Sequence, residues 1–193
     1  MRTINSAFMT GLLVAMLTLL NGCAALVDSV NQGPVAIDDS QRTWGSWLDD
    51  QTIETITTVN ISKANPALRT ARVKVVSFNG TVLLIGQVPN QQLKALASEV
   101  AQNVAKVRQV YNELEIGPNA DLLTQSNDSW LTGKIKTAMM SSDATTADRI
   151  KINTEQGAVF LMGLVTPEMA EEAATIAANT QGVSRVVKVF EYI

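Results

Sequence analysis

Two apolar runs, at 72–88 and 149–165, stand out in the pattern of hydrophobic and polar positions along the chain. Each run is interrupted once near its middle, by Asn79-Gly80 in the first and by Gln156-Gly157 in the second. An Asn-Gly pair between apolar segments is a strong signal for a tight turn, and the second run keeps its glycine. The pattern therefore predicts one β-hairpin in each half of the chain.

Helical periodicity flanks both hairpins. Stretches at about 51–62 and 129–141 precede them, and apolar residues recur at helical spacing after the first hairpin at Leu93, Leu96, Ala97, Val100 and Val104. Pro167 suits the first turn of a helix after the second hairpin. A short apolar segment follows each of these later helices, at 107–116 and 183–192. The predicted order of elements is αββαβ, twice.

The two halves also share sequence. The segments NGTVLLIGQV (79–88) and QGAVFLMGLV (156–165) carry five identical residues at a spacing of 77. Such a long period indicates a duplicated domain and not a solenoid. A strand that returns through a helical crossover runs parallel to the strand before the helix. We therefore predict an α+β fold of two tandem domains, each αββαβ with a three-stranded mixed sheet packed on two helices.

The predicted boundaries divide the chain into five parts. They are a signal peptide (1–22), a lipidated tether (23–47), a first domain (48–116), a linker (117–127) and a second domain (128–193). Each domain is small, so the core of one domain alone gives only marginal stability.

The second strand of each hairpin is apolar on both faces. Leu83 and Ile85, and likewise Phe160 and Met162, point away from the face that meets the helices. One interpretation is that this second face packs on the other domain or on the tether. The other is that it remains exposed as a patch for a ligand.

The first 23 residues have the layout of a secretory signal peptide, with Arg2 before a predominantly apolar run that is 14 residues long, from Ala7 to Leu20. That run is too short to span a bilayer comfortably as a helix. Its end, Leu20-Asn21-Gly22-Cys23, resembles the bacterial lipobox. The resemblance implies cleavage before Cys23, diacylglycerol on its sulfur and an added acyl chain such as palmitate. An ordinary signal peptide or a short anchor helix are the alternatives.

The residues after the cysteine bear on location. In lipoproteins of the enterobacterial type, an Asp directly after the acylated cysteine favours the inner membrane. Ala24 and Ala25 occupy these places here. By that resemblance we expect a lipid-anchored protein of the outer membrane, with its body on the periplasmic face.

Composition removes several classes of function. The 193 residues include no His and one Cys, so the commonest general base and any internal disulfide are absent. No phosphate-binding loop, nucleophile elbow or paired metal-ligand motif is present. The net charge of −3 gives no case for nucleic acid. We therefore expect no enzymatic activity, no cofactor and no bound metal.

The candidate site lies on the helix at 129–141, for which Asn127 or Asp128 is a suitable N-cap. On a helical wheel one stripe forms the expected core face and a second stripe lies a third of a turn or more away. The core stripe contains Leu131, Ile135, Ala138 and Met139, and the second contains Trp130, Gly133, Thr137 and Met140, with Lys134 and Lys136 beside it.

The second stripe combines an aromatic ring, a small residue and a thioether between lysines. Trp favours the headgroup region of a bilayer, and lysines can meet lipid phosphates. Alternatively, Trp130 packs on the first domain or on the linker. Residues 121–193 contain six Lys or Arg and nine Asp or Glu, so a site for anionic lipid must be local. The predicted lipid-binding residues are Trp130, Leu131, Gly133, Lys134, Lys136, Thr137 and Met140.

The repeated motif, with RVKV or RIKI followed by G-x-V-x-L-x-G-x-V, a helix and a strand, resembles the BON domain. Two such domains behind a lipobox resemble the dual-BON-domain outer-membrane lipoproteins, the division and outer membrane stress-associated lipid-binding family. The resemblance implies binding of anionic, phosphatidylglycerol-like phospholipid through the first helix of the second domain. It also implies support of outer-membrane integrity at division sites, with envelope-assembly or division proteins as possible partners. The alternative is a protein-interaction scaffold whose lipid contact is incidental.

Overall fold

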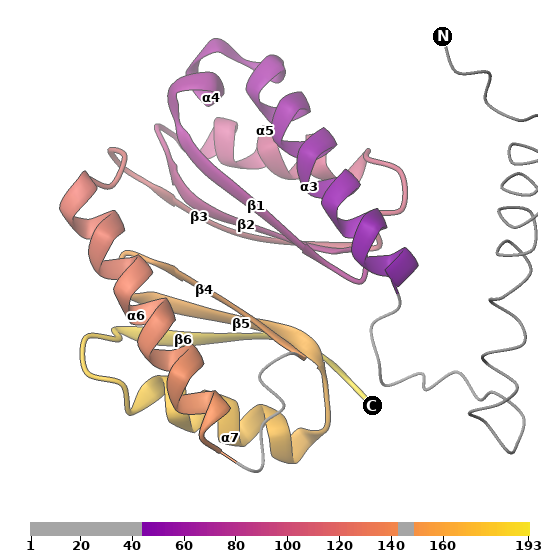
Figure 1. Cartoon of the computed structure of the whole chain (residues 1–193). Coiled ribbons are helices and arrows are strands. Elements are labelled where there is room, and N and C mark those ends of the chain that lie inside the picture. Colours follow the sequence, from indigo (N-terminus) through magenta and orange to yellow (C-terminus); the bar gives the residue numbers. More distant parts are fainter. Residues whose placement is uncertain (1–43, 143–148) are drawn as a thin grey trace, which may run out of the picture. The chain divides into compact units, whose positions relative to one another are not determined.

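The computed structural model describes residues 44–142 and 149–193 (Figure 1). Residues 1–43, which contain the predicted signal peptide, Cys23 and most of the tether, lie outside the described residues. The first copy consists of α3 (Trp44–Ala64), α4 (Pro66–Thr70), β1 (Arg72–Phe78), β2 (Thr81–Val88), α5 (Gln91–Gln102) and β3 (Gln109–Ile116). The second consists of α6 (Leu122–Met140), β4 (Ile150–Glu155), β5 (Ala158–Val165), α7 (Pro167–Ala178) and β6 (Arg185–Tyr192).

Both copies form the predicted α+β arrangement of a mixed three-stranded sheet and helices. The strand orders are β1-β2-β3 and β4-β5-β6. In each sheet the first pair is antiparallel and the second pair is parallel, which confirms the predicted crossover. The sequence pattern did not predict the short helix α4, which Asn65 caps through its side chain.

The two hairpins turn at residues with positive φ. Asn79 and Gly80 have φ of 50° and 75°, and Gln156 and Gly157 have φ of 48° and 74°. Positive φ at both central positions is the hallmark of the turn that matches the twist of a two-stranded ribbon. The asparagine and the glycines therefore stand where the backbone needs them.

A buried aspartate joins the first helix of each copy to its hairpin turn. Asp50 accepts hydrogen bonds from the backbone N–H groups of Asn79 (2.8 Å) and Gly80 (3.0 Å). In the second copy Asp128 accepts from the N–H groups of Gln156 and Gly157, both at 2.8 Å. The turn N–H groups thus receive a partner, and the helix is fixed against the sheet.

Each copy has a core between its helices and its sheet. In the first copy the buried residues come from α3, α4, α5 and the helix-facing side of the strands, and include Ile53, Ile61, Leu68, Val82, Leu84 and Ala97. In the second they include Ile135, Met139, Val159, Leu161, Ala170 and Ala173.

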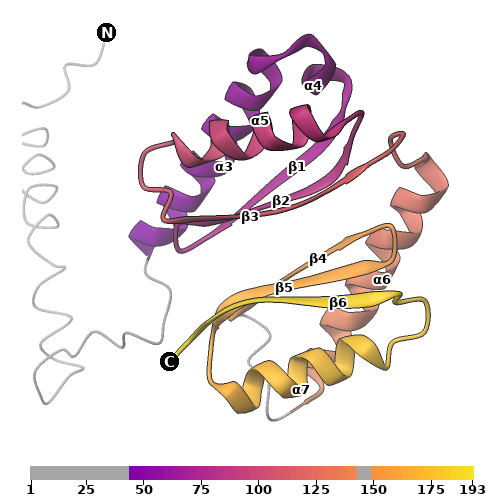
Figure 2. The ribbon, with the colours of Figure 1, turned by 180° about the vertical axis from the view of Figure 1, so that it is seen from behind.

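A third apolar cluster lies between the two sheets, whose other faces are turned toward each other (Figure 2). It contains Leu83 and Ile85 from β2 together with Phe160 and Met162 from β5. The prediction that the second face packs on the other domain is therefore confirmed, and the alternative of an exposed ligand patch is wrong. Its buried members are Val76, Phe78, Leu83, Ile85, Ala158, Phe160, Met162 and Val189.

Ion pairs between the copies surround this cluster. Arg72 contacts Glu155 at 2.9 Å, Lys151 contacts Glu54 at 2.6 Å, and Arg108 pairs with Glu191. Burial in this region lowers the pKa of the nearby Lys74 ammonium group, although the negative charge of Glu155 opposes that shift and part of the side chain reaches solvent. The apolar cluster and its charged border hold the two copies as one body.

Two predicted helix starts were wrong. The helix expected at 129 begins at Leu122, with Asp121 as its N-cap and not Asn127 or Asp128. The expected linker 117–127 is therefore helical from Leu122. Asp128 has the right chemistry for an N-cap, but its carboxylate serves the hairpin turn from inside the helix. Similarly, α3 begins at Trp44, inside the expected tether.

Candidate functional site

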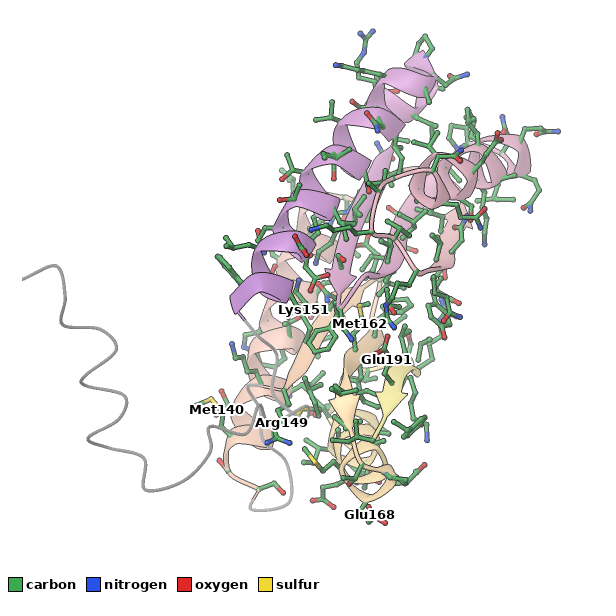
Figure 3. The ribbon with its side chains drawn as sticks, turned by 90° about the vertical axis from the view of Figure 1, so that its right-hand side faces the viewer. Met140, Arg149, Lys151, Met162, Glu168 and Glu191 are labelled. Carbon is green, nitrogen blue, oxygen red and sulfur yellow. The ribbon has the colours of Figure 1, made fainter. Side chains whose placement is uncertain are left out.

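Helix α6 separates a buried side from an exposed side. Leu131, Ile135 and Met139 are fully buried, whereas Trp130 and Met140 keep 59% and 70% of their surface exposed. Figure 3 shows Met140 at the outer side of α6, pointing away from the sheet. The indole of Trp130 is therefore not a core residue, and the alternative in which it packs against the first domain or the linker is wrong.

Leu131 differs from the other predicted lipid-binding residues. It is fully buried, so it cannot contact a lipid on the surface and does not belong to that set. Its position on the core side of the wheel already indicated this. A Cβ added at Gly182 would lie 3.0 Å from Leu131 Cδ2, so Leu131 packs directly beneath the turn that follows α7. Its contribution is to position that turn beside α6.

The two lysines of α6 are held differently. Lys134 Nζ lies 4.3 Å from the centre of the Trp130 ring, a cation–π contact, and 3.5 Å from the Gln181 carbonyl oxygen. Lys136 is exposed and makes no hydrogen bond or ion pair with the described residues. The Lys134 ammonium is thus fixed beside the indole, while that of Lys136 is free to follow any nearby negative charge.

A shallow groove runs along the exposed side of α6. It is open to solvent and has a volume of about 720 Å³. Its second wall comes from the end of α7 and the following turn, because the buried Leu131 holds that turn close. The lining residues are Trp130, Gly133, Lys134, Thr137, Ala138 and Ser141 on one side and Asn179, Thr180 and Gln181 on the other.

The exposed side of α6 bears positive charge only. The one carboxylate within the helix, Asp128, is buried and occupied by the hairpin turn. Asp121 stands before the helix, where the backbone N–H of Thr124 donates to it and lowers the pKa of its carboxyl group. Although the second domain is net negative, Lys134 and Lys136 therefore face solvent without an acidic neighbour on their own helix.

Two exposed leucines extend this side, and the sequence analysis missed them. Leu122 and Leu123 are each 80% exposed in the first turn of α6. Leu123 lies seven residues before Trp130, which is about two turns of helix, so it shares the side of Trp130, and Leu122 lies next to it. Both leucines fall in the expected linker and were not predicted as part of the site, although a Leu-Leu pair between polar residues indicates an exposed apolar contact.

Neither a metal site nor a membrane-spanning helix is found in the part of the chain that the structure describes. Within residues 44–142 and 149–193, no group of three or more His, Cys, Asp or Glu side chains is arranged to hold a metal ion. No helix in these ranges is both long enough and apolar enough to cross a membrane. The two buried aspartates are engaged by turn N–H groups, which is a structural role.

Comparison with known proteins identifies the class that this fold and surface define. The sequence of the BON-domain family matches the chain twice, over residues 49–118 and 127–193. The chain belongs to the BON-domain family and carries two copies of the domain, as its repeat predicted.

Particular relatives share this architecture over most of their length. Outer membrane lipoprotein DolP of Haemophilus influenzae is 40% identical over 184 residues, which cover 94% of each chain. A 21 kDa hemolysin of Actinobacillus pleuropneumoniae is 37% identical, covering 79% of this chain and 78% of the relative. Osmotically-inducible protein Y of Escherichia coli is 25% identical, with coverage of 78% and 76%. None of these names denotes an enzyme.

Proposed function

We propose that the chain is an outer-membrane lipoprotein that binds anionic phospholipid through helix α6 of its second BON domain. Acylated Cys23 anchors it at the periplasmic face, and the two-domain body supports outer-membrane integrity, with division sites as its place of action. The likeness to an outer membrane lipoprotein supports the location. The lipid contact and its place in the cell are our own inference.

The observation that carries the proposal is the exposed indole of Trp130 beside the Lys134 ammonium. An aromatic ring with a polar N–H suits the interface between headgroups and acyl chains. At 59% exposure the ring stands free, and the cation 4.3 Å from its centre can meet a lipid phosphate. Leu123 and Met140, near the two ends of α6, add apolar contacts on the same side.

The acyl chains on Cys23 and the lysines of α6 contribute different free energies of membrane binding, so they have different roles. Acyl chains contribute about 0.8 kcal/mol for each buried methylene, so two or three chains hold the protein firmly. Each lysine near an anionic surface contributes about 1 kcal/mol, and salt screens that attraction. Helix α6 therefore selects the lipid and orients the body, while Cys23 keeps the protein at the membrane.

The alternative of a protein-interaction scaffold depended on an exposed apolar face around Leu83 and Phe160. Both residues are buried between the two sheets, so that surface is not available to a partner. Envelope-assembly or division proteins remain possible partners through other surfaces. Lipid binding is therefore the function that we put forward.

The test uses the unacylated mature chain, residues 24–193, which keeps every described residue. We expect it to bind phosphatidylglycerol vesicles more tightly than phosphatidylcholine vesicles, with a blue shift of Trp fluorescence. Trp130→Ala and Met140→Asp are expected to weaken the binding, because the first removes the interfacial ring and the second places a negative charge against the lipid.

A matched control is Leu96→Ala, a partly buried residue of α5 in the first domain, far in the fold from α6. It tests whether a general loss of stability reduces binding. Thermal unfolding of each variant shows whether the fold is kept. Equal vesicle affinity of folded Trp130→Ala, Met140→Asp and the parent chain would remove the assignment of the contact to α6.

A further inference from the structure

Helix α3 of the first copy exposes a stripe of side chains that the proposed function does not use. The α3 stripe consists of Leu48, Thr52, Thr55 and Val59. Spacings of four, three and four residues place all of them on one face of the helix. Leu48 is 58% exposed, Val59 is 40% exposed, and Ile56 beside them is 43% exposed. Figure 1 shows α3 on the outer side of the first sheet, whose other face meets the second copy, so the stripe is open to a partner.

The two threonines of the α3 stripe are prepared for burial. The Thr52 hydroxyl donates to the Leu48 carbonyl at 2.9 Å, and the Thr55 hydroxyl donates to the Gln51 carbonyl at 2.8 Å. A hydroxyl whose proton already has an acceptor within the helix costs less to remove from water than a hydroxyl without a partner. Each threonine also has a methyl group, so the stripe can be covered as apolar surface.

The repeated unit does not require these apolar residues. In α6, the equivalent helix of the second copy, Ser126 is equivalent to Leu48 and Lys134 to Ile56 when the two buried aspartates are aligned. An apolar residue is therefore exposed at both positions in the first copy alone. The α3 stripe contains no charged residue, so it offers no cation to a lipid phosphate. An apolar protein surface suits it better than an anionic bilayer does.

One flank of the α3 stripe has charges of opposite sign at its two ends. Asp49, Ile56 and Lys63 recur every seven residues, which is close to two turns, so they lie in a row along α3. Asp49 forms an exposed ion pair with Lys106 at 2.6 Å. Lys63 is exposed and makes no hydrogen bond or ion pair with the described residues. The row is therefore acidic at one end, apolar in its centre and basic at the other end.

Such a row is complementary to itself when two helices pack antiparallel. The two-fold axis of a symmetric dimer brings the same surface of both copies together. With the axis at Ile56, this residue meets its own counterpart, and Lys63 of each copy approaches Asp49 of the other. A parallel pair would instead bring like charges together at both ends, which is unfavourable. The charges therefore favour a second copy of this chain as the partner, in one orientation.

We propose that α3 forms an antiparallel interface between two copies of this chain. The α3 stripe is its apolar centre, and the two pairs of Lys63 with Asp49 fix its register. One helix face buries less area than a standard protein interface, so the pair is weak in solution. Anchoring of both copies in one leaflet, as in the proposed function, raises their effective concentration. The interface itself involves no lipid, so it goes beyond that function and can be tested without vesicles.

Disulfide cross-linking tests this geometry, because residues 24–193 contain no cysteine and an introduced thiol is unique. Ile56→Cys lies on the two-fold axis and is expected to link to its own counterpart, as is Thr55→Cys beside it. Thr52→Cys and Val59→Cys lie on opposite sides of the axis. Along the helix they are about 12 Å and about 9 Å from their own counterparts, beyond the reach of a disulfide. Only a mixture of these two variants should therefore link.

The measurement is the rate of disulfide-linked dimer formation in a glutathione redox buffer, for variants that keep the thermal unfolding of the parent. The matched control is Ser126→Cys, an exposed position on α6, which reports random collision. We expect Ile56→Cys to link at least about tenfold faster than this control, because a populated interface raises the effective concentration of the thiols. Adding Lys63→Glu should slow this linkage. Adding Asp49→Lys as well should restore it, because exchanging both charges keeps them complementary.

Three outcomes would overturn the interface. The first is linkage of Ile56→Cys, and of the mixture, at the rate of the Ser126→Cys control. The second is faster linkage of Thr52→Cys with itself than with Val59→Cys, which would indicate a parallel pair. The third is an unlinked Ile56→Cys thiol that phosphatidylglycerol vesicles protect from an aqueous maleimide, which would assign the face to lipid. A chain that cross-links as expected but binds no vesicles would instead refute the proposed function and leave the interface in place.

Discussion

Two buried polar atoms have no hydrogen-bond partner among the described residues, Thr57 Oγ1 and Asn153 Nδ2. When Asp50 is aligned with Asp128, the position equivalent to Thr57 is Ile135. The spacing of 77 residues between the hairpins makes Val76 the equivalent of Asn153, so a hydrocarbon side chain stands at both equivalent positions. A buried donor or acceptor without a partner carries a desolvation cost of about 1 to 3 kcal/mol. At both pairs of equivalent positions, one copy therefore buries an unpaired polar atom and the other buries a hydrocarbon side chain, which carries no such cost.

This comparison predicts that Asn153→Val stabilises the protein. The substitution removes an orphan amide from the space between the sheets, so we expect the free energy of unfolding in urea to rise by about 1 kcal/mol or more. The matched control is Asn112→Val, since Asn112 Nδ2 donates to the Lys94 carbonyl at 2.7 Å and its loss should destabilise. A fall in stability for Asn153→Val would contradict the orphan assignment.

The two lysines of α6 provide a second prediction for individual residues. Lys134 is fixed by the indole and a carbonyl, whereas Lys136 is free. We expect Lys134→Gln to remove most of the preference for phosphatidylglycerol over phosphatidylcholine. Lys136→Gln should weaken binding to all anionic vesicles alike, by about 1 kcal/mol that disappears at high salt. Titrations at two salt concentrations separate these outcomes, and identical behaviour of both variants would refute the distinction.

At the level of elements, the orientation of α6 depends on Asp128. Its carboxylate accepts two backbone N–H groups from the turn of the second hairpin, and it is buried. This link determines which side of α6 faces the sheet and which side faces outward. The same link from Asp50 in the first copy indicates that it is a property of the repeated unit.

We therefore predict that Asp128→Ala lowers the free energy of unfolding by about 2 to 4 kcal/mol, because two turn N–H groups lose their charged partner. The control is Asp121→Ala, which removes an exposed N-cap and should cost less than the loss of the buried Asp128 carboxylate. The pKa of Asp121 is lowered in the folded state, so its contribution is present above its unfolded pKa and vanishes as pH falls through the folded value. Urea titrations at neutral and acidic pH measure both effects, and an Asp128→Ala variant as stable as Asp121→Ala would contradict the role.

At the level of the whole molecule, the two domains share a core. Leu83, Ile85, Phe160 and Met162 are buried where the sheets meet, and ion pairs such as Arg72 with Glu155 border them. Each domain is too small to bury much apolar surface by itself. The contact between sheets therefore supplies stability that neither domain has alone, and it leaves α6 on an outer surface.

This arrangement predicts cooperative unfolding. We expect one calorimetric transition for residues 24–193, and Phe160→Ala should cost about 3 to 5 kcal/mol and separate the transition into two. The control is Glu115→Gln, which removes an exposed ion pair with Arg185 and should change stability by less than about 1 kcal/mol. Two independent transitions in the parent chain would show that the domains do not stabilise each other.

The sequence by itself determined the elements whose signals are local. Asn79-Gly80 required positive φ and so specified the hairpin, and the helical crossover specified the parallel third strand. The spacing of 77 residues predicted two copies of one domain. The strands that are apolar on both faces, at 81–88 and 158–165, predicted that each sheet has a second buried face. The exposed side of α6 was also readable, because Trp130, Gly133, Thr137 and Met140 recur at helical spacing.

Only the tertiary structure decided how distant segments use these residues. Asp128 has the chemistry of an N-cap and also of a turn acceptor, and the hairpin 28 residues later decided between them. The groove beside Trp130 needs Asn179, Thr180 and Gln181, which reach α6 because Leu131 packs beneath Gly182. Periodicity along one helix carries no information on which other segment will pack against it, because that choice depends on contacts made across the folded chain.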